Sequence, residues 1–206
     1  MKTGKPNVRF PVYSHRIYDI VAGEYEEVNH PDILIVDDGS TDDTGAIADR
    51  YAAQYPTMVR VIHQPNGGHG AGLNQGIQTA QGLYFKVVDS DDRLDRDSLL
   101  SLMDVLREHA DSTNQFDLLV HNYVYDQVGH DAVFSVNYRV AMKPGKVQTW
   151  EEMRRFPVHK QFMIHALVYR TQMLRDIPLV LPEHTFYVDN LYIYLPLPYA
   201  KRVYYL

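Results

Sequence analysis

The chain of 206 residues contains no cysteine. This absence excludes disulfides, thiolate nucleophiles and cysteine-ligated zinc, and it fits a reducing compartment. Basic residues are also scarce, because 20 Lys and Arg stand against 26 Asp and Glu, for a net charge of −6. Proteins that bind nucleic acid through its phosphates normally carry a basic stripe, so we expect no nucleic-acid partner.

Long apolar runs are absent as well. No segment approaches the roughly 18 apolar residues of a membrane span, and no apolar core of a signal peptide follows the first ten residues. We therefore expect a soluble, cytoplasmic protein. The length predicts one domain, residues 1–206. The sequence stops inside the apolar, strand-like segment 203–206, which predicts a catalytic domain truncated at its C-terminus.

Short apolar segments alternate with amphipathic ones in the first half of the chain. This order is typical of an α/β fold with a mostly parallel central sheet flanked by helices. The expected strands are 7–12, 33–36, 59–62 and 84–88, and the expected helices are 17–28, 40–55, 73–80 and 97–109. The part beyond residue 110 is less regular.

Aspartates follow two of the expected strands directly. Asp37 and Asp38 come after 33–36, and the run from Asp89 to Asp92 comes after 84–88. Ligands of parallel sheets bind beyond the carboxyl ends of the strands, so both clusters should face one crevice. The alternate spacing lets Asp89 and Asp91 converge on one cation, and hard oxygen ligands suit Mg²⁺ or Mn²⁺. A solvated acidic turn that caps the next helix is the other interpretation.

Three other motif interpretations fit poorly. An EF-hand calcium loop needs glycine at its sixth position, where this chain has Leu94. A haloacid-dehalogenase phosphatase expects threonine two residues after its second aspartate, where Arg93 stands. The glycine-rich segment 67–72 lacks the Gly-Lys-Ser/Thr ending of an ATP-binding P-loop. Its glycines would instead let backbone approach a ligand near a helix N-terminus.

Five motifs occur in the order known from one enzyme family. They are Pro11-Val12-Tyr13, Ile35-Val36-Asp37-Asp38-Gly39-Ser40-Thr41-Asp42, Asn66-Gly67-Gly68, Asn74-Gln75-Gly76-Ile77 and Asp89-Ser90-Asp91-Asp92. In this the chain resembles the family 2 glycosyltransferases, inverting enzymes of the GT-A fold. The resemblance is dense between 33 and 100. It implies a nucleotide-sugar-binding half, 1–110, and a smaller, irregular acceptor-side half, 111–206.

The resemblance also implies a role for individual residues. Donor nucleotide contacts are expected from Pro11, Val12, Tyr13, Asp38, Gly68, Asn74 and Asp89, with Asp38 accepting from the uracil ring. Asp91 would be the direct metal ligand, supported by Asp89. The general base that deprotonates the acceptor would be Asp189, with a helix cap as its alternative role. The chain departs from the family at Leu73, where arginine is common, and His69 is the residue that could substitute in part.

The implied activity is metal-dependent, inverting transfer of a sugar from a UDP-sugar to an acceptor hydroxyl, with Mn²⁺ or Mg²⁺ as cofactor. The acceptor would be a saccharide or lipid-linked saccharide, in polysaccharide or glycoconjugate synthesis. The expected location is the cytoplasm, at the inner membrane face, with any peripheral membrane association made by missing segments. The alternatives are a nucleotide-binding GT-A module without transferase activity, within a larger assembly, and a sugar nucleotidyltransferase. The latter would need a glycine-rich loop after the first strand, which Tyr13–Arg16 does not provide.

Overall fold

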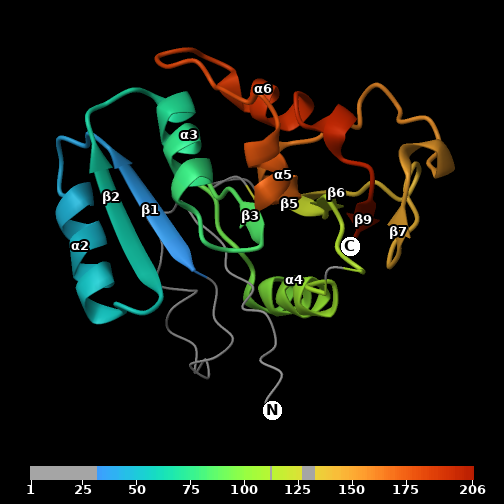
Figure 1. The fold of residues 1–206 in the computed structure, drawn as a ribbon, viewed down its shortest axis with the longest axis horizontal. Coiled ribbons are helices and arrows are strands. Elements are labelled where there is room, and N and C mark those ends of the chain that lie inside the picture. The colour runs from blue at the N-terminus through green and yellow to red at the C-terminus, as the bar shows by residue number, and fades with distance from the viewer. Residues whose placement is uncertain (1–31, 112, 127–132) are drawn as a thin grey trace.

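Two parallel strands begin the described part of the chain. The computed structural model describes residues 32–111, 113–126 and 133–206, so the strand expected at 7–12, the helix expected at 17–28 and the site residues Pro11, Val12 and Tyr13 lie outside it. Strand β1 (Ile33–Asp38) pairs in parallel with β2 (Val59–Gln64), and helix α2 (Thr44–Gln54) connects them. Figure 1 shows this β1–α2–β2 unit at one side of the molecule.

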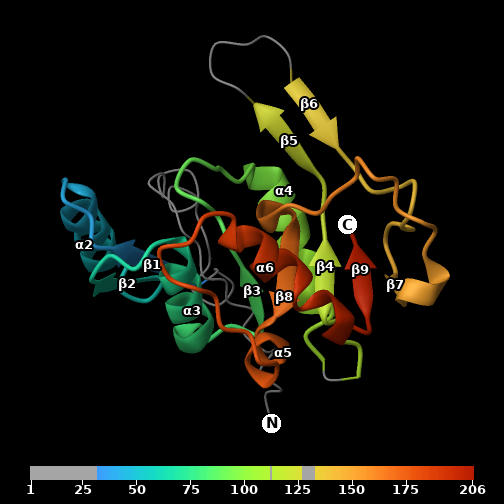
Figure 2. The same ribbon diagram turned by 90° about the horizontal axis from the view of Figure 1, so that it is seen from above.

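A five-stranded sheet forms the centre of the molecule. Its order is β3 (Tyr84–Lys86), β8 (Leu167–Arg170), β4 (Leu118–Val120), β9 (Val203–Tyr205) and β7 (Val147–Gln148). Figure 2 shows these strands side by side. Strands β4 and β9 are parallel, but β8 runs antiparallel to both of its neighbours, and β7 is antiparallel to β9. The α/β class is therefore as expected, but this sheet is mixed.

The hairpin of β5 (Tyr123–Asp126) and β6 (Val133–Val136) projects from this sheet, as Figure 2 shows. Four further α-helices of the described residues flank the sheets, namely α3 (His69–Thr79), α4 (Arg96–Glu108), α5 (Thr171–Asp176) and α6 (Val188–Tyr194). The 3₁₀ turns are η1 (Trp150–Glu152), η2 (Ile164–Ala166) and η3 (Leu197–Tyr199). Within the ranges described, no helix has the length and apolar character needed to cross a membrane.

Local chemistry explains where the longer helices begin. The side chain of Asp95 accepts from the backbone N–H of Ser98 (2.9 Å), which caps α4. Helix α3 begins at His69, four residues before the predicted start at Leu73. Its first turn is rich in glycine, which has a poor helix propensity, so the sequence pattern did not predict a helix there.

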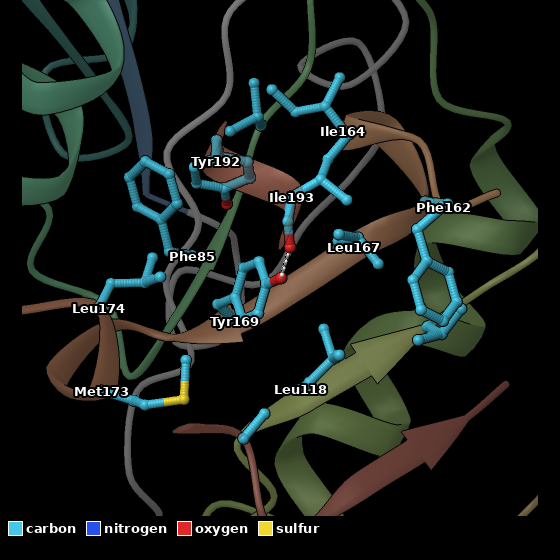
Figure 3. Packing of buried hydrophobic residues seen from close by; sticks show 14 of the residues in the cluster. Phe85, Leu118, Phe162, Ile164, Leu167, Tyr169, Met173, Leu174, Tyr192 and Ile193 are labelled. Atoms are coloured by element: carbon cyan, nitrogen blue, oxygen red, sulfur yellow. Dashed lines mark hydrogen bonds between the residues drawn. The ribbon is translucent and has the colours of Figure 1, made fainter. Parts of the chain in front are cut away.

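Helix α6 is fixed to the central sheet by the hydrophobic core. The side chains of Tyr192 and Ile193 are 0% and 1% exposed, and Figure 3 shows them beside Phe85 of β3 and Tyr169 of β8. The hydroxyl of Tyr169 donates a hydrogen bond of 2.7 Å to the carbonyl of Ile193. Buried hydroxyls need such a partner, so this contact fixes the helix that carries Asp189.

Candidate active site

A cavity of about 530 Å³ opens beside the carboxyl end of β1. Four aspartates from three separate parts of the chain line it, together with one histidine. No lysine or arginine lies among the described residues that line it. The lining comprises Ile35, Val36, Asp37, Asp38, Ser40, Thr44, Ile47, Ala48, Gly68, His69, Gly72, Asp89, Ser90 and Asp189. The cavity is therefore acidic on its polar side and apolar along β1 and α2.

Asp38 joins the end of β1 to the glycine-rich loop. Its Oδ1 accepts from the side chain of Gln64 (2.6 Å) and from the backbone N–H of Gly67 (2.9 Å). Its Oδ2 accepts from the backbone N–H of Gly68 at 2.7 Å. A carboxylate offers about four lone-pair positions, so Oδ2 retains capacity for a further donor from the cavity.

The side chain of Asp37 forms hydrogen bonds at the β1–α2 connection. Its Oδ1 accepts from the backbone N–H of Ser40 (3.0 Å), and its Oδ2 lies 2.8 Å from Nδ1 of His63. Burial opposes ionisation, but the hydrogen bonds from Ser40 and His63 outweigh it and hold the pKa of Asp37 below its ordinary value. Asp37 is thus engaged with Ser40 and His63, whereas Asp38 is engaged with Gln64 and the glycine-rich loop.

Asp89 and His69 lie in contact in the cavity lining. Nε2 of His69, at the start of α3, lies 3.4 Å from Oδ1 of Asp89, which follows β3. The contact with Asp89 raises the pKa of His69 against the effect of burial, and Asp189 and Asp38 raise it further. Three carboxylates of the cavity therefore favour the protonated form of His69.

The two predicted metal ligands, Asp89 and Asp91, lie in one turn after β3. The backbone N–H of Asp92 bonds to the carbonyl of Asp89 (3.0 Å), so residues 89–92 form a tight turn. Asp89 lines the cavity, whereas the side chain of Asp91 is exposed and is not part of the lining. Within the described ranges, no three acidic or histidine side chains are grouped closely enough to hold a metal ion on their own.

Asp189 reaches the cavity from the other half of the chain. It lies in the first turn of α6, after Tyr187 in a left-handed conformation (φ 59°). Its carboxylate lines the same cavity as Asp38 and Asp89, although 100 residues separate Asp189 from Asp89 in the sequence. Of the residues predicted from the sequence, the structure thus brings Asp38, Gly68, Asp89 and Asp189 together.

The order of these residues along the chain matches a known family. The model of the family described as glycosyl transferase family 2 matches residues 19–169, well over half of the chain. The chain belongs to glycosyl transferase family 2. The matched range includes both aspartate turns and the glycine-rich loop, and it ends before Asp189.

Known relatives of this family 2 chain are longer than the chain itself. It is 33% identical over 135 residues to the glycosyltransferase GlyG of Streptococcus pneumoniae serotype 4, covering 63% of this chain and 43% of the relative. Crystallised S. aureus TarS 1–349 in complex with UDP superposes with a TM-score of 0.70 at 20% identity, over 97% of this chain and 57% of that one. The expected GT-A fold is thereby confirmed.

A second solved structure shares this fold. It is the mannosyltransferase PcManGT of Pyrobaculum calidifontis in complex with GDP-Man and Mn²⁺, with a TM-score of 0.59 and 15% identity. The superposition covers 98% of this chain and 56% of that one. At this identity the likeness concerns the fold alone.

Two positions of the family 2 motif face away from the cavity. The side chain of Asn74 is hydrogen-bonded to the backbone of Leu181 and is not part of the cavity lining. Leu73, where the sequence suggested a lost positive contact, is 0% exposed and packs into the core. In this chain, the position where relatives commonly have arginine is thus part of the hydrophobic core.

A buried polar network behind the Asp89 turn was missed by sequence reasoning. Lys86 is 1% exposed, and its Nζ donates to the carbonyl of His165 (2.6 Å) and to Nε2 of His121 (2.8 Å). Nδ1 of His165 lies 3.3 Å from Oδ2 of Asp92. Burial lowers the pKa of Lys86 to about 7, against the opposing effect of Asp92 and Asp89. The one available signal was a lysine inside an otherwise apolar strand.

Proposed function

We propose that this domain is a metal-dependent, inverting glycosyltransferase that moves a sugar from a UDP-sugar to an acceptor hydroxyl. The observation that carries the proposal is the meeting of Asp38, Asp89 and Asp189 in one cavity. These carboxylates supply the three functions that the reaction needs, namely nucleotide recognition, binding of the charged diphosphate and proton removal. The UDP and UDP-GlcNAc complexes of the structurally similar TarS support a uridine nucleotide as donor.

Asp38 is the proposed partner of the uracil ring. The imide N–H of uracil is a donor, and Oδ2 of Asp38 accepts only one hydrogen bond, from Gly68, among the contacts described above. The N–H groups of Gly67 and Gly68 fix both oxygens of the carboxylate. Recognition by a carboxylate already held in place saves the entropy of ordering it on binding.

Asp89 and Asp91 are the proposed holders of a Mg²⁺ or Mn²⁺ ion. Such ions are usually bound by one or two carboxylates together with substrate phosphates and water, so a site with fewer than three protein ligands fits them. When bound, the ion would neutralise the diphosphate leaving group. An acidic cavity whose described lining has no lysine or arginine needs that charge, because His69 is its one basic side chain.

Asp189 is the proposed general base. It would accept the proton of the acceptor hydroxyl while that oxygen forms a bond to the anomeric carbon and the bond to the diphosphate oxygen breaks. Attack from the face opposite the leaving group inverts the anomeric centre. The required geometry is strict, because reacting atoms must lie about 3–3.5 Å apart.

The metal assignment predicts a change in UDP affinity. Calorimetric titration with UDP should show at least about tenfold tighter binding with Mn²⁺ than with EDTA, which corresponds to about 1.4 kcal/mol. Asp91→Asn should lose this difference without a change in melting temperature, since the side chain is exposed. Asp104→Asn, an exposed aspartate on α4, is the matched control. Equal metal dependence in wild type and Asp91→Asn would exclude Asp91 as a ligand.

The base assignment predicts a loss of turnover without a loss of donor binding. Asp189→Asn should bind UDP as the wild type does, yet hydrolysis of UDP-GlcNAc should fall by about 100-fold or more, in the range typical for removal of a general base. Release of UDP from UDP-GlcNAc, with water as the acceptor, is the assay. A wild-type protein that binds UDP but releases none from UDP-GlcNAc would instead favour a nucleotide-binding module.

A further inference from the structure

The segment that leads into Asp189 is buried only at its ends. Leu181 and Val188 are 1% and 2% exposed, whereas all six residues between them, 182–187, are exposed. Two of these, His184 and Tyr187, have left-handed backbone angles (φ 47° and 59°), which are unfavourable for residues with a side chain. An exposed segment with such backbone angles needs specific contacts to keep one conformation.

Asn74 provides the first of these contacts. On α3, its Nδ2 donates to the carbonyl of Leu181 (2.8 Å), and its Oδ1 accepts from the N–H of the same residue (3.0 Å). This paired contact joins residues 107 positions apart in the sequence. It satisfies both backbone groups of a buried residue at the point where the exposed segment begins.

The glycine-rich loop provides the second set of contacts. The N–H of His184 donates to the carbonyl of Gly67 at 2.8 Å. A Cβ atom at Gly70 would lie 2.2 Å from the carbonyl oxygen of Pro182, and one at Gly68 would lie 3.2 Å from the backbone nitrogen of His184. Gly68 and Gly70 therefore let the backbone of the Asp189 segment pack directly on the start of α3.

We propose that Asn74 is a positioning residue for Asp189, acting with the glycine loop rather than contacting the donor. This proposal rests on the role of Asp189 proposed above. The core packing of Tyr192 and Ile193 fixes the C-terminal part of α6, while Asn74 and Gly67 fix the segment before it. Asp189 lies between these two anchors, so its carboxylate is held at the cavity from both sides. The same loop is bonded to Asp38, which places the nucleotide contact and the base on one rigid support.

Hydrogen exchange measured by mass spectrometry tests the positioning without any substrate. In Asn74→Ala, peptides covering 181–188 should exchange at least about tenfold faster, because the amide of Leu181 loses its acceptor, while peptides of β4 keep wild-type rates. Gly70→Ala, which forces the same segment away through the carbonyl of Pro182, should give the same local pattern. Unchanged exchange of 181–188 in both variants would overturn the proposal.

Arg175→Ala is the matched control. Arg175 on α5 donates to the carbonyls of Ile77 (2.9 Å) and Gln78 (3.1 Å), so it joins the second half of the chain to the opposite end of α3. Its loss should speed exchange around 77–80 and leave 181–188 unchanged. Faster exchange of 181–188 in this variant too would show general loosening of α3 and would also overturn the proposal.

Turnover then separates positioning from donor contact. Asn74→Ala should lower kcat for UDP-GlcNAc hydrolysis by tenfold to 100-fold, as expected for a displaced catalytic group, with unchanged KM and unchanged Kd for UDP. Added to Asp189→Asn, it should lower kcat no further, because it acts through Asp189. A weaker Kd for UDP, or additive losses in the double variant, would contradict the proposal. Normal turnover of Asp189→Asn would refute the base assignment, while the exchange result would still decide whether Asn74 holds the segment.

Discussion

The buried lysine behind the Asp89 turn gives the chain a distinctive dependence of stability on pH. Nδ1 of His121 lies 2.7 Å from the carbonyl of Asn122, so this nitrogen carries the proton and Nε2 is the acceptor. Nζ of Lys86 therefore donates to two acceptors, His121 and the carbonyl of His165. A neutral amine has two N–H groups, which match these acceptors in number. Burial lowers the pKa of Lys86 to about 7, so the amine changes between its charged and neutral forms near neutral pH.

The sign of the effect follows from proton binding. An unfolded lysine keeps its proton to a pKa of about 10.4, whereas Lys86 in the folded protein releases it near pH 7. The unfolded state thus binds more protons between these values, so the free energy of unfolding rises with pH in this window. At 1.36 kcal/mol for each pKa unit, the rise from pH 7 to pH 9 is about 2 kcal/mol. His121, whose pKa burial lowers to about 3, changes charge below this window.

Urea unfolding of wild type and Lys86→Met at pH 7 and pH 9 measures this contribution. Methionine is unbranched, is one atom shorter than lysine and has no amine, so the variant should lack the rise of about 2 kcal/mol. At pH 9 the variant should also be less stable than wild type, because two buried acceptors lose their donor at a cost of roughly 1–3 kcal/mol each. Lys143→Met, at an exposed position, should follow the wild-type pH curve. Parallel pH curves for wild type and Lys86→Met would refute the assigned titration.

Two further predictions concern ion pairs of different burial. Asp117→Ala should lower the free energy of unfolding by about 3 kcal/mol in chemical denaturation. The reason is that Asp117 accepts from Arg170 (2.9 Å) and its side chain is only 14% exposed. As a control, Asp104→Ala, at an exposed position, should change the free energy of unfolding by less than about 0.5 kcal/mol. His63→Gln should lower stability by less than about 1 kcal/mol, and more at pH 5.5 than at pH 8.5. Contacts with Asp49 and Asp37 raise the pKa of His63, so its stabilisation is complete at low pH and is lost as the pH rises through the raised pKa. An equal effect at both pH values would contradict this assignment.

The periodic part of the fold could be predicted from the sequence, because it depends on short-range patterns. The strands expected at 33–36 and 59–62 are observed as 33–38 and 59–64, and the helix expected at 97–109 is observed as 96–108. The position of β8 could not be predicted. Its four residues pair with β3 and β4, which lie far earlier in the chain. No local sequence pattern predicts that a strand pairs antiparallel to such distant neighbours.

Asp38 and Asn74 both belong to family motifs, but their contacts in the structure differ. Both are polar residues beside glycines, and both were assigned to the donor from their place in the motif. Asp38 accepts from backbone donors of the neighbouring loop and lines the cavity. Asn74 bonds to Leu181, a residue that belongs to no motif and is 107 positions away. A motif residue that lines the cavity and one that does not look alike in sequence, because the difference lies in a long-range partner. Gly70 has the same ambiguity, because a Cβ atom there would collide with the carbonyl oxygen of Pro182, so this glycine is needed for the packing of protein on protein.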